Sequence, residues 1–237
     1  GFLSIGEAKM SRASNPDLKE SFVWGLDLPD NHKSVLGGNP FLGRNQWPSE
    51  MPDFRESVYP FFEAGMKCGK DIMGAFALGM GIPKDSFFQS SDKSISRGSI
   101  IYYPSQPSNL GEKQFGVSPH TDYGCLTLLW QDQVGGLEVK ASNGDWVRAH
   151  PIENTLVVNV GDLLMRWSNN KLKSTIHRVI NRKDVERFSM VIAWDPNFET
   201  VVDPSLVCKD SSKLNYPPVK CGEYILSRFD SSFNYRT

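Results

Sequence analysis

Long apolar runs and clustered cysteines are both missing from this sequence. No run approaches the roughly 18 to 20 apolar residues that a membrane-spanning helix needs, and the start, GFLSIGEAKM, lacks the basic segment and apolar stretch of a secretory leader. The cysteines, Cys68, Cys125, Cys208 and Cys221, are far apart and form no CxxC pair. This usage predicts reduced thiols in a cytoplasmic protein rather than a disulfide framework.

An excess of charge of one sign is also missing. Lys and Arg number 26 against 27 Asp and Glu, and the charges are scattered without long blocks. The sequence therefore has no electrostatic footprint for nucleic acid or for an anionic membrane, and we expect a small-molecule substrate as the partner. With 237 residues, 39% of them hydrophobic, the chain can bury a substantial core. We expect one domain, 1–237, that acts as a monomer.

A loop-rich start with one short helix, and two longer helices, are predicted outside the centre of the chain. Residues 1–94 are interpreted as a loop and helical region: residues 1–50, rich in Gly, Pro, Asn and Ser, predict loops with one short helix. Apolar residues at helical spacing from Pro52 predict a long helix that ends at GIP, 81–83, with Pro60 kinking or dividing it. The tail, 206–237, contains a second predicted helix at 221–233.

The central region, 95–205, changes to the pattern of short strands. Runs such as SIIYY (99–103), GCLTLLW (124–130), TLVVNV (155–160) and RFSMVIAW (187–194) are rich in β-branched and aromatic residues and are separated by turn signals. This spacing predicts a mainly β fold with flanking helices, a sandwich or barrel, and a jelly roll fits it best.

A possible metal site lies at the start of one of these runs. In SPHTDYGCLTLLW, His120 and Asp122 are two positions apart, so an extended backbone would project both to one face. The pair alone is a weak signal. His177, 57 positions further along in STIHRV, adds a second imidazole on a strand that could lie beside the first. Two His and one carboxylate leave three positions open on a metal, as in non-haem Fe(II) oxygenases.

A possible anion site follows on the next strand. Arg187 and Ser189, in RFS, share one strand face. A guanidinium pairs bidentately with a carboxylate, and an adjacent hydroxyl adds a donor. No acidic residue in 187–194 offers Arg187 a partner. An anionic ligand is therefore expected there.

These motifs resemble the 2-oxoglutarate and Fe(II) dependent dioxygenases of the isopenicillin N synthase-like superfamily. The similar segments are IIYYPSQP, HTDYGCLTLLWQD, QVGGLEV, VVNVGDLLMRWSNNKLKSTIHRV and ERFSMVIAWDPNF, in the family's order. The resemblance implies a distorted double-stranded β-helix that holds Fe(II) through His120, Asp122 and His177. It also implies a 2-oxoglutarate cosubstrate whose far carboxylate meets Arg187, Ser189 and Tyr103, and O2 as oxidant.

Two departures from the family pattern are visible. Many plant members carry Asn at the position that is Ile101 here, so one cosubstrate contact is expected to be missing or replaced. Members also usually have a longer N-terminal region.

The activity that the resemblance implies is oxidative decarboxylation of 2-oxoglutarate coupled to hydroxylation, desaturation or oxidative cyclisation of a small molecule. Counting by twos from Arg187 brings Ala193 and Asp195 to the same face, near the substrate side of the iron in the resembling family. A carboxylate in a cavity needs a donor or cation, so we predict that Asp195 receives a group such as an amine of the substrate. Asp162, in NVGDLL, is interpreted as a cap of the following turn.

Three other functions stay open at this point. An oxidase of the isopenicillin N synthase or aminocyclopropanecarboxylate oxidase type would use the Arg187 and Ser189 pair for its own substrate and no 2-oxoglutarate. A zinc hydrolase would use the same three ligands to activate water. A non-catalytic jelly-roll binding protein would have kept only the fold.

Overall fold

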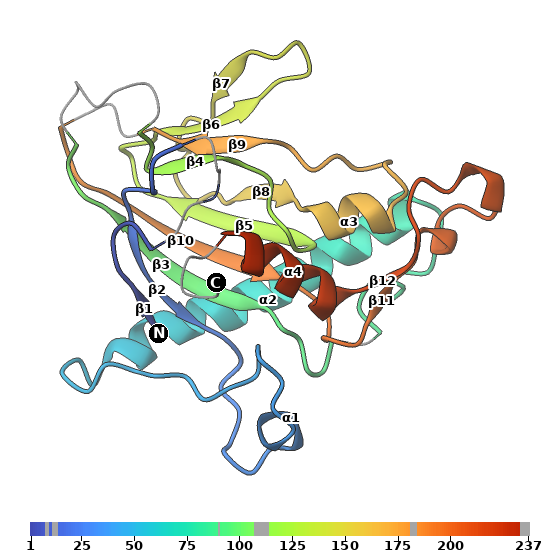
Figure 1. The fold of residues 1–237 in the computed structure, drawn as a ribbon, viewed down its shortest axis with the longest axis horizontal. Coiled ribbons are helices and arrows are strands. Elements are labelled where there is room, and N and C mark those ends of the chain that lie inside the picture. Colours follow the sequence, from blue (N-terminus) through green and yellow to red (C-terminus); the bar gives the residue numbers. More distant parts are fainter. Residues whose placement is uncertain (8–9, 11–13, 90, 107–113, 181–183, 233–237) are drawn as a thin grey trace.

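Two antiparallel sheets form the centre of the molecule, and helices lie on the outside (Figure 1). The computed structural model describes residues 1–7, 10, 14–89, 91–106, 114–180 and 184–232. The larger sheet has six strands in the order β1-β2-β3-β10-β5-β8, and the smaller has four in the order β4-β9-β6-β7. Their bounds are β1 Phe2–Leu3, β2 Glu20–Trp24, β3 Arg97–Tyr103, β4 Val117–His120, β5 Leu126–Gln131, β6 Leu137–Lys140, β7 Trp146–Arg148, β8 Val157–Val160, β9 His177–Val179 and β10 Arg187–Trp194. This arrangement confirms the predicted jelly roll with flanking helices.

The long helix α2, Phe54–Gly79, packs on the outer face of the larger sheet. It is continuous through Pro60, so the proline does not divide it, and it ends close to the predicted GIP stop. Two glycines allow the close approach: a Cβ added at Gly65 would lie 1.9 Å from Ile192 Cδ1, and one at Gly69 would lie 2.5 Å from Trp194 Cδ1. The helix and strands β5 and β10 thus share one core.

The N-terminal region differs from the prediction of loops and one short helix. The short helix is present as α1, Lys33–Leu36, but β1 and β2 add two strands to the edge of the larger sheet. Strand β2 pairs antiparallel with β3, from Glu20 opposite Tyr102 to Trp24 opposite Gly98. The two strands were not predicted, because a five-residue run among Pro, Gly and Asn has little pattern of its own. The partners of β2 are β1 and β3, and its pairs with β3 are 74 to 82 residues apart in the sequence.

The C-terminal part closes the other end of the sheets. Helix α3, Asp162–Trp167, follows β8, and a two-stranded pair of β11, Val201–Val202, and β12, Val219–Lys220, leads into α4, Cys221–Ser232. Short 3-10 helices lie at Pro204–Leu206 and Ser211–Lys213. Helix α4 agrees with the predicted helix, whose last residue, 233, lies outside the described residues. Of the helices in the described ranges, none combines the length and apolar character that crossing a bilayer requires.

A second, smaller core lies between the two sheets. It is built from β3, β4, β6 and β9, that is, from both sheets. Its buried members are Ile101, Tyr103, Val117, Leu137 and Val179. This interior is the part of the fold that positions the candidate site.

Candidate metal centre and anion pocket

The two predicted histidine ligands lie opposite each other on paired strands. His120 ends β4 and His177 begins β9, and the two are direct antiparallel partners. Their ring centroids are 4.3 Å apart. Asp122 Oδ1 lies 3.8 Å from His120 Nε2 and 3.6 Å from His177 Nε2. One ligand atom from each of the three side chains falls within 4.8 Å of the others, close enough to hold one metal ion.

Asp122 reaches this position through a turn rather than through a strand. Strand β4 ends at His120, so the expected alternation along an extended backbone does not apply to the pair. The turn is held by backbone hydrogen bonds, in which the Asp162 N–H donates to Asp122 O at 2.8 Å and the Leu163 N–H donates to Gly124 O at 3.0 Å. The side chains converge as predicted, but for a different geometric reason.

Both imidazoles are oriented by their own backbone. His120 Nδ1 lies 2.8 Å from Ser118 O, and His177 Nδ1 lies 3.0 Å from Thr175 O. A carbonyl oxygen only accepts, so Nδ1 carries the proton in each ring and donates it. This tautomer leaves a lone pair on each Nε2, the atom that faces Asp122.

The charges of the site suit a divalent cation. Burial, followed by the charge of His177, lowers the pKa of His120 to about 3, although Asp122 acts in the opposite direction. Burial alone would raise the pKa of Asp122, but His177 and His120 and the hydrogen bonds from Thr127 and Asn159 outweigh it, so the pKa is lowered overall. At neutral pH, His120 is therefore neutral and Asp122 is ionised, the forms in which both bind a metal.

Two residues that the sequence did not place at the site, Asn159 and Asp162, contact the ligand-bearing segments. Asn159 Nδ2 donates to Asp122 Oδ2 at 2.6 Å and holds that carboxylate in place. Asp162 accepts hydrogen bonds from Thr121 at 3.2 Å, Ser174 at 2.7 Å and Tyr224 at 3.2 Å. Asp162 thus connects both ligand-bearing segments with α4.

The interpretation of Asp162 as a cap is wrong. The N-cap of α3 is Gly161, which makes no side-chain capping bond, and Asp162 is the first residue of the helix. The carboxylate instead turns toward the ligand segments. The motif NVGD is visible in the sequence, but the hydrogen-bond partners of Asp162 come from three other segments of the chain.

The predicted anion pocket contains two buried donors without an acceptor. Arg187 and Ser189 are fully buried, and Arg187 Nη1 and Ser189 Oγ have no hydrogen-bond partner among the described residues. The Arg187 guanidinium lies over the ring of Tyr103, 4.6 Å from its centroid. Buried donors are costly to leave unpaired, and this pair has the geometry and charge to meet a carboxylate.

The rest of the Arg187 guanidinium is fixed by the residues around it. Its Nε donates to Gly135 O at 2.6 Å, and its Nη2 donates to Gln131 Oε1 at 3.3 Å. Gly135 and Gly136 have φ of 76° and 95°, and a Cβ at Gly136 would lie 2.6 Å from Ile180 O. The backbone conformation at Gly135 and Gly136, and the close approach of Ile180 O to Gly136, explain why glycine occupies both positions of the GG in QVGGLEV.

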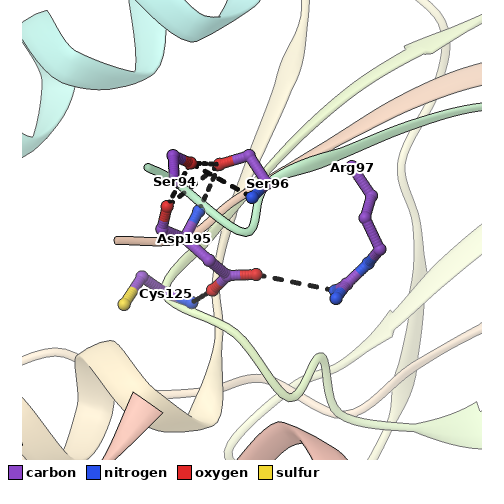
Figure 2. A network of polar contacts seen from close by, with 5 residues as sticks. All are labelled: Ser94, Ser96, Arg97, Cys125 and Asp195. Atoms are coloured by element: carbon purple, nitrogen blue, oxygen red, sulfur yellow. Dashed lines mark hydrogen bonds and ion pairs between the residues drawn. The ribbon is translucent and has the colours of Figure 1, made fainter. Parts of the chain in front are cut away.

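A cavity of about 530 Å³ extends from Asp122 along the inner face of the larger sheet. Val191 and Ala193 line it, as the spacing by two from Arg187 predicts, and Arg97 lines it from β3. Asp195 is not among the described lining residues. It is fully buried, with Oδ1 accepting from the Cys125 N–H at 2.8 Å and Oδ2 lying 3.5 Å from Arg97 Nη2 (Figure 2). The predicted contact between Asp195 and a substrate amine stays a prediction.

Fold and site together define a class of protein. The class is a jelly-roll protein in which two His and one Asp lie close enough to hold one metal ion and in which two buried donors, Arg187 Nη1 and Ser189 Oγ, have no partner among the described residues. The family model described as the 2OG-Fe(II) oxygenase superfamily matches residues 98–196, which include all three metal-site residues, Arg187 and Ser189.

Known relatives agree with this class. A 2-oxoglutarate-Fe(II) type oxidoreductase, hxnY, of Emericella nidulans is 35% identical over 240 residues, which cover 98% of this chain and 68% of the relative. A 2-oxoglutarate-dependent dioxygenase, caaD, of Aspergillus niger is 34% identical over 203 residues, covering 84% of this chain and 61% of that protein. The chain thus spans about two thirds of the length of these relatives.

Solved structures show the same fold. A full-length Neurospora crassa protein, solved in complex with α-ketoglutarate and thymine, has a TM-score of 0.83 and 31% identity, covering 98% of this chain and 73% of that one. The structure of JOX2 with 2-oxoglutarate, Fe and JA has a TM-score of 0.79 and 26% identity, covering 99% and 69%. This chain belongs to the 2-oxoglutarate and Fe(II) dependent oxygenase superfamily. It is an oxidoreductase whose cofactors are Fe(II) and 2-oxoglutarate, as the motifs predicted.

Proposed function

We propose that His120, Asp122 and His177 hold the Fe(II) on one face and leave the opposite face to ligands. Support comes from the convergence of the three side chains within 4.8 Å and from the outward Nδ1–H bonds that direct both Nε2 atoms inward. Two nitrogens and one carboxylate oxygen match the ligand set of non-haem Fe(II) oxygenases.

Arg187, Ser189 and Tyr103 would hold the far carboxylate of 2-oxoglutarate in this proposal. The observation that carries it is the pair of buried donors, Arg187 Nη1 and Ser189 Oγ, which have no partner among the described residues. The apolar side chains of Leu129, Val191 and their neighbours between the sheets would contact the methylene groups of the cosubstrate.

The residues of the site position the reactants and restrict water. When bound, Fe(II) supplies the activation of O2 that converts 2-oxoglutarate to succinate and CO2 and oxidises a C–H bond of the substrate. The Arg187 guanidinium, fixed at Gly135 O and Gln131 Oε1, sets the depth of the cosubstrate. Leu129 of β5 packs against the core between the two sheets and would help to keep bulk water away from the metal side of the larger sheet.

The prime substrate is proposed to be a small organic molecule that enters the cavity of about 530 Å³. The Neurospora crassa structure with thymine and the structures of dioxygenases for auxin oxidation come from relatives that bind or oxidise such molecules. The outcome would be hydroxylation, desaturation or ring closure. An amine on the substrate, a monomeric state and a cytoplasmic location remain proposals from the sequence. Light scattering on the purified protein tests the monomer.

The test of the cosubstrate site is anaerobic. Fe(II) and 2-oxoglutarate are added to metal-free protein, and the weak visible charge-transfer band of chelated 2-oxoglutarate is titrated. Arg187→Ala should raise the 2-oxoglutarate requirement roughly tenfold or more, because a charge-assisted hydrogen bond contributes about 1.5–3 kcal/mol. Arg148→Ala, which removes an exposed arginine beside Glu138, is the control and should leave the titration unchanged.

The same experiment separates the alternatives. Without a band in the wild type, or with the same 2-oxoglutarate affinity in Arg187→Ala, an oxidase that uses Arg187 for its own substrate would be favoured. A zinc hydrolase would retain Zn²⁺ after purification and turn over without O2. His177→Ala should lose stoichiometric iron, and full iron content in this variant would contradict the ligand assignment.

A further inference from the structure

Arg97 lines the cavity, and no sequence motif assigned it a role. It is the first residue of β3 and the direct partner of Ala193 on β10, so both side chains project from the same face of the larger sheet. Both residues line the cavity. The Arg97 side chain is 20% exposed, which leaves part of it open to a ligand.

Asp195 fixes Arg97 from the side away from the cavity. Figure 2 shows the Asp195 carboxylate between the Cys125 N–H and the Arg97 guanidinium. The Asp195 backbone is held by two buried serines: its N–H donates to Ser96 Oγ at 2.7 Å, and Ser94 Oγ donates to its carbonyl oxygen at 2.6 Å. The carboxylate is therefore part of a rigid support.

The turn that contains Asp122 and Gly124 packs against the Asp195 carboxylate, and no bound molecule fits between them. A Cβ added at Gly124 would lie 2.2 Å from Asp195 Oδ1. Only a glycine at this position of HTDYG admits the buried carboxylate. Asp195 Oδ2 faces the Arg97 guanidinium as an ion pair without a hydrogen bond, and of the two residues Arg97 is the one that lines the cavity.

The Arg97 guanidinium is not fully satisfied by these contacts. Its Nη1 is buried and has no hydrogen-bond acceptor among the described residues. The rings of Phe41 and Phe229 lie 5.5 Å and 4.9 Å from the guanidinium carbon and hold it by cation–π contacts. These rings offer no strong acceptor, and the same rings line the cavity.

Other charges on the cavity wall already have a partner or a role. Asp122 faces the histidines, and Arg44 lies 3.6 Å from Asp30 with a side chain that is 71% exposed. Among the charged residues described on the cavity wall, Arg97 is thus the one with a buried donor left over.

We propose that Arg97 binds an acceptor oxygen of the prime substrate, a carboxylate or a carbonyl, and that Asp195 is the positioning residue that aims Arg97. The substrate class is a compact molecule with an apolar body, which packs on Phe41 and Phe229, and an acceptor at one end. This deepens the proposed function and rests on it, since the molecule bound at Arg97 is the one to be oxidised. It is an alternative to the amine predicted from Asp195, and the probes below distinguish the two.

The experiment uses the Fe(II) and 2-oxoglutarate complex under anaerobic conditions. Benzoate, benzamide and benzylamine share one ring and differ in the group they present: a carboxylate, a neutral carbonyl or an ammonium. Binding of each is measured by calorimetry and by the change it causes in the visible charge-transfer band. In the wild type, benzoate or benzamide should bind at least tenfold more tightly than benzylamine, and the better of the two identifies the acceptor.

Three variants assign this preference to Arg97. Arg97→Met should weaken the preferred acceptor probe at least tenfold without improving benzylamine beyond about twofold. Asp195→Asn, which keeps an oxygen for the Cys125 N–H but removes the charge beside Arg97, should weaken the same probe by a smaller factor. Arg44→Met removes a cavity-rim arginine of the same charge and should leave all three affinities unchanged.

The results that overturn the inference are distinct from those that overturn the cosubstrate proposal. Tighter binding of benzylamine that is lost in Asp195→Asn would restore the amine interpretation. Wild-type affinities in Arg97→Met, or no binding of either acceptor probe, would also reject Arg97 as the recognition residue. In each case the charge-transfer band forms with an unchanged 2-oxoglutarate requirement, whereas absence of the band in the wild type rejects the cosubstrate proposal instead.

Discussion

At the scale of one residue, a substitution at Ser189 should affect protein stability and cosubstrate binding differently. Its hydroxyl is fully buried and has no partner among the described residues. Ser189→Ala should therefore leave the free energy of unfolding of the ligand-free protein unchanged or slightly higher. The same change removes a donor to the proposed carboxylate, so the dissociation constant of 2-oxoglutarate should rise roughly tenfold.

Chemical denaturation and titration of the charge-transfer band measure the two quantities. Ser21→Ala, at a buried serine of β2, is the control and should not change cosubstrate affinity. A loss of stability in Ser189→Ala without a loss of affinity would mean that the hydroxyl serves the fold.

Much of the candidate site could be predicted from single residues. His120, His177, Arg187 and Ser189 have unusual chemistry for strand positions, and Asp122 stands out because it follows His120 by two residues. Arg97 could not be predicted in this way, because its role depends on the register between β3 and β10. Asn159 and Gln131 were missed for the same reason: an amide has no chemical signature until its partner is known.

At the scale of an element, the contact between α2 and the larger sheet gives a graded prediction. Gly65 faces the flexible end of Ile192, Gly69 faces the rigid indole of Trp194, and Gly79 has open space. Alanine improves helix propensity by about 1 kcal/mol in a helix interior, where Gly65 and Gly69 lie, and by less at Gly79, the last residue of α2. Gly79→Ala should stabilise, Gly65→Ala should be nearly neutral after Ile192 adjusts, and Gly69→Ala should destabilise by about 1–3 kcal/mol through overpacking.

Urea denaturation of the three variants gives this ranking directly. Gly65 and Gly69 both lie in the interior of α2, so the difference between these two variants reports the packing against β10, and Gly79→Ala serves as the uncrowded reference. Equal effects would show that the helix and the sheet do not approach as closely as the glycines indicate.

The elements that could be predicted are those that carry their own periodicity. Helix α2 has enough turns for its apolar spacing to stand out, and α4 likewise. Strand β2 has only five residues, too few for a clear periodicity, and it is defined by its backbone pairing with β3. The paired positions of His120 and His177 also needed the structure, because β4 and β9 have only four and three residues.

At the scale of the whole molecule, α4 is connected to the metal centre through Tyr224. Its hydroxyl donates to Asp162 at 3.2 Å. Burial, followed by the charge of Asp162, raises the pKa of Tyr224 to about 12. In the unfolded chain a tyrosine titrates near 10. The stability that the protonated phenol contributes is therefore complete below about pH 10 and is lost as the pH rises toward 12.

Tyr224→Phe removes this titration. The difference in unfolding free energy between wild type and Tyr224→Phe, measured on metal-free protein, should shift against the wild type between about pH 10 and pH 12. Asp162→Asn keeps an acceptor but removes the charge, so its dependence should be weaker than that of the wild type. A constant difference across this range would mean that Tyr224 is not linked to Asp162.

The direct pairing of His120 with His177 has a consequence for how the chain avoids misalignment. A slip of one residue between β4 and β9 would turn one imidazole away from Asp122 and expose Val117 or Val179 from the interior. We therefore expect metal binding to favour the native alignment of these two short strands, in addition to the pairing of β9 with β6. Slower amide hydrogen exchange in β4 and β9 after metal loading, with little change in α2, would be the signature of that role.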